Sequence, residues 1–277
     1  MYEISVKRDF ESIIKKIEEK DYFKFPKLLH GFWERIDYLS NGSNDLEIVK
    51  KNIKEIGNNF GRKIYKTPPR YSDFFKPCSD LGVGEHYLEI INLLQNPKSN
   101  ILWGISEKPF NIENKKINNF KVNEKSLFWI KEIVKAPYID GCFWKDITSL
   151  NLMQKFLLCI KDFEVIVIGM DHLKNINKYL KLKNFHFVKV AMPLALKAKE
   201  FQTALENFHK KINKPAIYLS QMSIDGITII CNSDLKDSFF FDMGRSLDIF
   251  GEKNFEYVWE KTLSENLKFG KRLIKFL

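Results

Sequence analysis

Residues 164–169 read EVIVIG, and this run of β-branched residues decides the fold. A continuous apolar run of this length, ended by a glycine, is typical of a strand buried on both faces of a parallel sheet. Strand-like runs follow at 184–191 (NFHFVKVA), 215–221 (PAIYLSQ) and 237–244 (DSFFFDMG), with helix-like segments between them. This alternation predicts an α/β, Rossmann-like architecture, with a mostly parallel sheet, right-handed crossovers and flanking helices.

The N-terminal half is richer in helical patterns. Its segment YFKFPKLL (22–29) reads as extended, and Pro26 indicates an edge strand or the entrance of a strand. Two more short strands are expected at 100–105 (NILWGI) and 136–143 (APYIDGCF), whereas 60–80 reads as a long loop. Apolar residues at helical spacing predict helices at 9–20, 30–39, 45–58, 84–95, 124–135 and 147–160.

We therefore expect a single α/β domain over 1–277. Its N-terminal part (1–160) carries a candidate acidic motif, the long loop and most helices. This part is expected to wrap around, or add strands to, a Rossmann-like C-terminal part (161–277). No internal repeat is present.

The formal net charge of +10 favours anionic partners such as phosphates, nucleic acid or acidic membrane surfaces. The lysines are scattered and occur together with asparagines, as an AT-rich coding sequence also produces. Because no known nucleic-acid-binding motif accompanies the charge, no nucleic-acid partner is expected. The basic C-terminus, 268–277 (KFGKRLIKFL), suits either a peripheral contact with a membrane or a last amphipathic helix.

The cysteines and the hydropathy pattern indicate the cellular compartment in which the protein is expected. The four cysteines lie far apart and form no C-x-x-C pair, which argues against a disulfide framework or a zinc site. The N-terminus has no hydrophobic signal region, and no apolar run approaches the roughly 18 residues that span a bilayer. We expect a cytoplasmic protein, with peripheral contact at the inner face of the membrane as the variant that the C-terminus allows. Nothing indicates an oligomeric state.

Ligands of open parallel sheets bind beyond the carboxyl ends of the strands, so the candidate site residues are sought there. Gly169 ends the first buried strand and allows a backbone to approach closely. Ser220, Gln221 and Ser223 join a strand to a helix N-terminus, which is a natural seat for a phosphate. Ser223 also suits a plain helix cap. No G-x-G-x-x-G or P-loop pattern occurs.

The last predicted strand ends in a polar turn. Asp242 is placed to hold a ribose or sugar hydroxyl, Gly244 follows it, and Arg245 is placed to pair with a phosphate. An ordinary Asp/Gly turn with a surface arginine explains the same residues. In the long loop, Arg62 and Arg70 lie among aromatic residues and suit either phosphate contacts or a loop anchored by its aromatics.

The stretch 30–34 (HGFWE) follows the extended segment directly and opens a helix. Glu34 suits a metal ligand or a general base, and His30 suits a ligand or a proton relay. The alternative places Phe32 and Trp33 in the core, with Glu34 exposed to solvent. A D-x-E pattern at 45–47 also spaces two carboxylates for a metal, but it reads more simply as a helix cap and first-turn acid.

Taken in order, HGFWE (30–34), VIVIGMDHL (165–173), AIYLSQMSIDGITII (216–230) and FFFDMGRSLDIF (239–250) resemble the GT-D-type bacterial glycosyltransferases. The similarity covers about 25–40 and 160–250. It implies a Rossmann-like enzyme that moves a sugar from a nucleotide-sugar donor, by default a UDP-sugar, to a glycan or to a protein- or lipid-linked acceptor.

The resemblance also implies roles for individual residues. It makes Glu34 the metal-site or catalytic residue, 220–223 the diphosphate seat, and Asp242 with Gly244 donor or acceptor contacts. The family holds Mn²⁺ or Mg²⁺ with an Asp-Gly-Glu-like motif. Here His30 replaces the first acid and the glutamate comes later, which leaves the metal dependence open. Phe32 and Trp33 are then expected to form a floor on which a sugar stacks.

Two other classes of function fit parts of the sequence. A nucleic-acid-binding protein would explain the positive charge and would bind oligonucleotides with a steep salt dependence. Another Rossmann-like enzyme on nucleotides or phosphosugars, such as a hydrolase, would explain the fold and would release free sugar without an acceptor.

Overall fold

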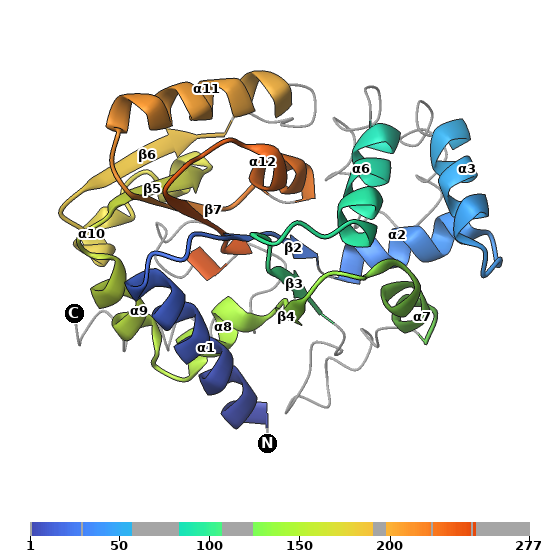
Figure 1. Cartoon of the computed structure of the whole chain (residues 1–277), viewed down its shortest axis with the longest axis horizontal. Coiled ribbons are helices and arrows are strands. Elements are labelled where there is room, and N and C mark those ends of the chain that lie inside the picture. Colours follow the sequence, from blue (N-terminus) through green and yellow to red (C-terminus); the bar gives the residue numbers. More distant parts are fainter. Residues whose placement is uncertain are drawn as a thin grey trace.

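The structure is a computed structural model (Figure 1). It describes residues 2–28, 30–56, 83–106, 124–190, 198–222, 224–244, 246 and 247. Within this part of the chain, no helix is long and apolar enough to cross a membrane.

Parallel strands form two sheets. The main sheet has five strands in the order β1-β8-β7-β5-β6, and the small sheet has three in the order β2-β3-β4; every pairing is parallel. Together with the helices around them, these sheets confirm the predicted α/β architecture. The strands are β1 (Lys24–Phe25), β2 (Lys27–Leu28), β3 (Trp103–Ile105), β4 (Tyr138–Asp140), β5 (Glu164–Gly169), β6 (Phe185–Lys189), β7 (Ala216–Ser220) and β8 (Ser238–Asp242).

One short segment joins the two sheets. Lys24 in β1 is in register with Phe240 of β8 and also bridges Ile101, next to the small sheet. Two residues later, β2 pairs with β3. β1 lies at the edge of the main sheet and β2 at the edge of the small sheet, and Pro26 directly precedes β2, so the expectation of an edge strand or the entrance of a strand is confirmed. Pro26 lies where the pairing changes sheets, and its carbonyl still accepts the Gly104 N–H at 2.9 Å.

Helices cover both faces of the main sheet (Figure 1). Val165 and Val167 of β5 point to the core shared with α1, α8 and α9, whereas Ile166 and Ile168 point to the core shared with α11 and α12. The strand is thus buried on both faces, as its β-branched run predicts. These helices are α1 (Tyr2–Glu18), α8 (Phe143–Ser149), α9 (Met153–Ile160), α11 (Ala198–Ile212) and α12 (Ile227–Asn232).

A second hydrophobic core lies beside the small sheet. It combines aliphatic side chains with large aromatic ones such as Trp33, Tyr87, Trp103 and Trp129, which are all at most 2% exposed. The N-terminal helices that contribute to it lie within two residues of their predicted bounds. They are α2 (His30–Ser40), α3 (Leu46–Ile56), α6 (Val83–Gln95) and α7 (Glu124–Ile133).

Two predicted helices are broken. The one expected over 147–160 is split between α8 and α9, and Asn151 between them has a left-handed backbone (φ 57°). The helix expected after Gly169 is a 3₁₀ turn at Asp171–Leu173 followed by the short α10 (Asn177–Leu180). Asparagine occurs in both regions, and asparagine favours turns over helix interiors. The loop predicted at 60–80 lies outside the described residues.

Candidate functional site

The sheet brings most of the predicted donor-site residues to one edge. β5, β7 and β8 are neighbours and parallel, so Gly169, Ser220 and Asp242 end adjacent strands. Ser220 is in register with Ile168 on one side and with Asp242 on the other. We call this end of the main sheet the carboxyl edge.

The β5 and β7 ends are packed into the protein. A side chain at Gly169 would meet Leu173 Cδ1 at 2.6 Å, so the glycine makes room for the 3₁₀ turn. Ser220 is fully buried and its hydroxyl donates to the Phe241 carbonyl at 3.2 Å. The Gln221 N–H donates to the Ile168 carbonyl at 2.8 Å. These hydrogen bonds join neighbouring strands. They use donors of Ser220 and Gln221 that the sequence analysis assigned to a phosphate.

Asp242 is the acidic group at this edge. It is 3% exposed, and its Oδ1 accepts the Gly244 N–H at 2.9 Å. Burial raises the pKa of Asp242, whereas the nearby Lys27 ammonium and the backbone N–H groups of Gly244 and Lys27 act in the opposite direction. A carboxylate held in this way, at the ligand-binding end of a parallel sheet, is a candidate for function rather than a turn residue alone.

Lys27 of β2 lies against the same turn and was missed by the sequence analysis. It is 8% exposed, and its Nζ donates to the Met243 carbonyl at 3.4 Å. A Cβ on Gly244 would lie 2.2 Å from this Nζ. The signal that was available is the placement of two lysines, Lys24 and Lys27, inside the otherwise apolar run YFKFPKLL, where an edge or the entrance of a strand was expected.

Ser246 completes the turn. Its N–H donates to the Met243 carbonyl at 3.1 Å, and its hydroxyl is buried without a hydrogen-bond partner in the described part of the chain. We define the carboxyl-edge cluster as Lys27, Asp242, Gly244 and Ser246. It combines a buried cation, a buried anion and a buried hydroxyl around one turn.

The N-terminal candidates are placed differently. His30 and Glu34 lie four residues apart in α2, but their side chains lie outside what the structure describes. Phe32 and Trp33 are 2% and 0% exposed, and Phe32 stacks on Tyr87 with ring centroids 5.3 Å apart. The expectation of a sugar-stacking floor is therefore wrong, because both rings are used in the core.

The D-x-E pattern is confirmed as the start of a helix. Asp45 Oδ1 accepts the Glu47 N–H at 2.9 Å, just ahead of α3, and Glu47 pairs with Lys50 at 2.8 Å. Several other predictions lie outside the described residues, namely those on Arg62, Arg70, Ser223, Arg245 and the basic C-terminus 268–277.

The metal implied by the resemblance does not fit the carboxyl-edge cluster. Asp242 is its one carboxylate, and that group faces an ammonium rather than further oxygen ligands, which is not how Mn²⁺ or Mg²⁺ is held. Across the described ranges, no group of three or more His, Cys, Asp or Glu side chains is arranged to hold a metal ion.

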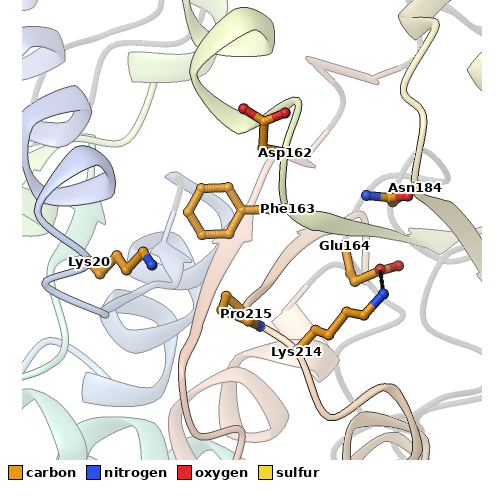
Figure 2. Close-up of a pocket in the computed structure, with 7 residues that line it drawn as sticks. All are labelled: Lys20, Asp162, Phe163, Glu164, Asn184, Lys214 and Pro215. Carbon is orange, nitrogen blue, oxygen red and sulfur yellow. Dashed lines mark hydrogen bonds and ion pairs between the residues drawn. The ribbon is translucent and has the colours of Figure 1, made fainter.

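A cavity of about 260 Å³ lies at the opposite, amino edge of the main sheet. Figure 2 shows Lys20 and Lys214 near it, with Phe163 and Pro215 between them. Parallel sheets bind ligands at the other end, so we assign the site to the carboxyl edge despite this cavity. The lining residues are Lys20, Asp162, Phe163, Glu164, Asn184, Lys214 and Pro215.

The buried acid in this cavity is fully paired. Glu164 Oε2 lies 2.8 Å from His186 Nε2, and Oε1 accepts from Lys214 Nζ at 3.1 Å. Hydrogen bonding to His186 lowers the pKa of Glu164, burial opposes this, and Lys214 adds to the lowering. We call Glu164, His186 and Lys214 the amino-edge cluster. Its interactions are those of a structural ion pair.

Comparison with protein-family models, curated proteins and solved structures gives no significant match to this chain. The site is therefore defined by its own geometry.

Proposed function

We propose that this chain is a glycosyltransferase that takes a sugar from a nucleotide-sugar donor, and that the donor lies at the carboxyl edge. The observation that carries the proposal is the buried Asp242 carboxylate beside Lys27 and Gly244. Charged groups are rarely buried unless they are paired or functional. These two lie where an open parallel sheet binds its ligands.

Glycosyl transfer requires hydrogen-bonding groups for the donor, a base for the acceptor and positive charge near the leaving diphosphate. The bond between the anomeric carbon and the donor diphosphate breaks, the acceptor oxygen forms the new bond, and a base takes its proton. Asp242 supplies a hydrogen-bond acceptor for a donor hydroxyl. Glu34 and His30, from the motif that opens α2, are the proposed bases. The nucleoside diphosphate leaves with the electron pair of the broken bond, so positive charge near it speeds the reaction.

Thermal unfolding against a panel of nucleotides tests the proposal. UDP, GDP, CDP, CMP, ADP and their common sugars are each added with and without Mn²⁺. A ligand at 100 times its dissociation constant stabilises the native state by about 2.7 kcal/mol. We expect one diphosphate class to stabilise the wild type and to do so much less in Asp242→Asn. Stabilisation by none of them contradicts the proposal.

Asp171→Asn is the matched control. Asp171 is an acid that follows β5 at the same edge, but it is exposed and paired with Lys189. The variant should respond to nucleotides as the wild type does. A radiolabelled donor then separates transfer from hydrolysis: label that appears as free sugar regardless of acceptor identifies a hydrolase instead.

A further inference from the structure

Two lysines of one short segment provide the starting observation. Lys24 and Lys27 flank Pro26, and each is 8% exposed. Lys24 Nζ donates to the carbonyls of Cys231 and Ser233 at 3.2 and 2.6 Å, where it caps the C-terminus of α12. Burial lowers the pKa of Lys24, with smaller effects from neighbouring charges. This lysine has a complete structural role.

Lys27 has no such role. Among the residues that the structure describes, its one hydrogen-bond acceptor is the Met243 carbonyl, at the long distance of 3.4 Å. That carbonyl also accepts the Ser246 N–H at 3.1 Å. An ammonium has three donors, so most of its hydrogen-bonding capacity is unused among the residues that the structure describes. Such a group is costly to bury unless something else pairs with it.

A second observation on the same turn points to a ligand. The buried Ser246 hydroxyl has no partner in the described part of the chain, although buried polar groups are nearly always paired. Gly244 lies against the ammonium, and any side chain there would reach Lys27 Nζ. Gly244 is also the half-buried member of the cluster.

We infer that Lys27 and Ser246 form a phosphate-binding site, called the seat below, that holds a phosphate group of the ligand. Asp242 stands beside this seat and accepts from the ligand's hydroxyls. The inference rests on the proposed function for the identity of the ligand, but the seat itself needs only a phosphate. In this proposal the Lys27 ammonium supplies the positive charge that a divalent metal supplies in the family that the sequence resembles. The leaving diphosphate would be stabilised by a side chain of the N-terminal segment.

Binding of inorganic pyrophosphate and orthophosphate to the full chain, in EDTA, tests the seat. We expect isothermal calorimetry to show that pyrophosphate binds the wild type and that Lys27→Met weakens it at least tenfold. Ser246→Ala should weaken it less, by a factor of about three. Lys27→Arg keeps the charge and should retain most of the affinity, which separates loss of the seat from loss of the fold.

Lys214→Met is the matched control, because it removes one lysine from the amino-edge cluster and changes the net charge equally. It should bind pyrophosphate within about twofold of the wild type. The inference is overturned if the wild type binds neither anion, or if Lys27→Met binds pyrophosphate as the wild type does.

The two proposals can fail separately. If Lys27→Met loses pyrophosphate but no nucleotide sugar binds the wild type, the seat stands and the transferase proposal falls. If nucleotide sugars bind wild type and Lys27→Met equally well, the transferase proposal stands and the seat falls.

Discussion

The two ends of the main sheet hold charges in different ways. At the amino edge, Glu164 has both oxygens paired, and the His186 and Lys214 side chains remain 37% and 67% exposed. At the carboxyl edge, Lys27 and Asp242 are both more than nine-tenths buried, and within the described part of the chain the ammonium has one hydrogen-bond acceptor, at 3.4 Å. A cavity alone would have directed attention to the amino edge. We place the proposed ligand site at the other end because its buried groups are incompletely paired among the described residues.

The largest expected effect comes from removing the buried acid. Asp242→Ala should lower the free energy of unfolding by about 3 kcal/mol, because the backbone N–H groups of Gly244 and Lys27 lose their acceptor, which Asp242→Asn largely keeps. Lys27→Met should stay within about 1 kcal/mol of the wild type or stabilise it, since the ammonium gains little from its own contacts.

Urea denaturation of the two single variants and the double variant measures the coupling between Asp242 and Lys27. The double variant should be more stable than Asp242→Ala by more than about 1 kcal/mol. Strictly additive changes would show that the two charges do not interact and would remove the contrast between the edges.

A smaller effect is expected at the glycine of the cluster. Gly244 has a left-handed backbone (φ 50°), and a Cβ there would lie 2.2 Å from Lys27 Nζ. Gly244→Ala should therefore cost about 1–2 kcal/mol of stability and weaken pyrophosphate binding. Gly42→Ala is the control, because Gly42 also has a positive φ (84°) but a Cβ there meets nothing within 4 Å. Equal losses in both variants would mean that backbone strain alone is responsible.

Substitution at the amino edge should change the free energy of unfolding less than substitution at the carboxyl edge. Glu164→Gln removes a charge from an ion pair whose partners are partly exposed, so we expect a loss of about 1 kcal/mol at neutral pH. Nucleotide and pyrophosphate binding should be unchanged. Loss of ligand binding in this variant would move the functional site to the amino-edge cavity.

The smallest expected effect concerns pH. The contributions of Glu164 and Asp242 to folding stability should change in opposite directions as the pH changes. Glu164 has a lowered pKa when folded, so its contribution is present at neutral pH and is lost as the pH falls through that pKa. Asp242 has a raised pKa, so its ionisation disfavours the folded state as the pH rises from about 4.

Stability curves of Glu164→Gln and Asp242→Asn between pH 3 and 7 check these signs. The deficit of Glu164→Gln should shrink toward low pH. The wild type should lose stability relative to Asp242→Asn toward neutral pH, by roughly a fraction of 1 kcal/mol per pH unit. Parallel curves for both variants would contradict the assigned pKa directions.

The C-terminal sheet was predictable because its strands carry their own signal. The runs at 164–169 and 216–220 are apolar except for Glu164 and Ser220 and are buried on both faces, so local sequence and tertiary structure agree. The order of the strands was not predictable, because the local sequence of a strand such as FFFD (239–242) contains no information on which strand it pairs with. Asp242, Gly244 and Ser220 were proposed from sequence because they lie at or just beyond the ends of predicted strands, and the parallel pairing of β7 with β8 brings these ends together.

Lys27 could not be assigned from sequence for the same reason. Its role depends on Met243, which lies 216 residues away in the chain. The segment around Pro26 reads as an edge because a proline interrupts a hydrogen-bonded ladder. Only the structure shows that the interruption falls between two sheets, so that one lysine caps α12 and the other reaches the carboxyl edge.

The shared segment has a consequence for how the chain folds. β1 pairs with β8, so the main sheet stays open on that side until nearly the whole described chain has left the ribosome. Contacts between such distant residues are slow to form, because a long loop must close before they stabilise anything. We expect β5, β6 and β7 to assemble first and the N-terminal segment to dock last. Until it docks, the edge that later receives β1 is a site for mispairing with other chains.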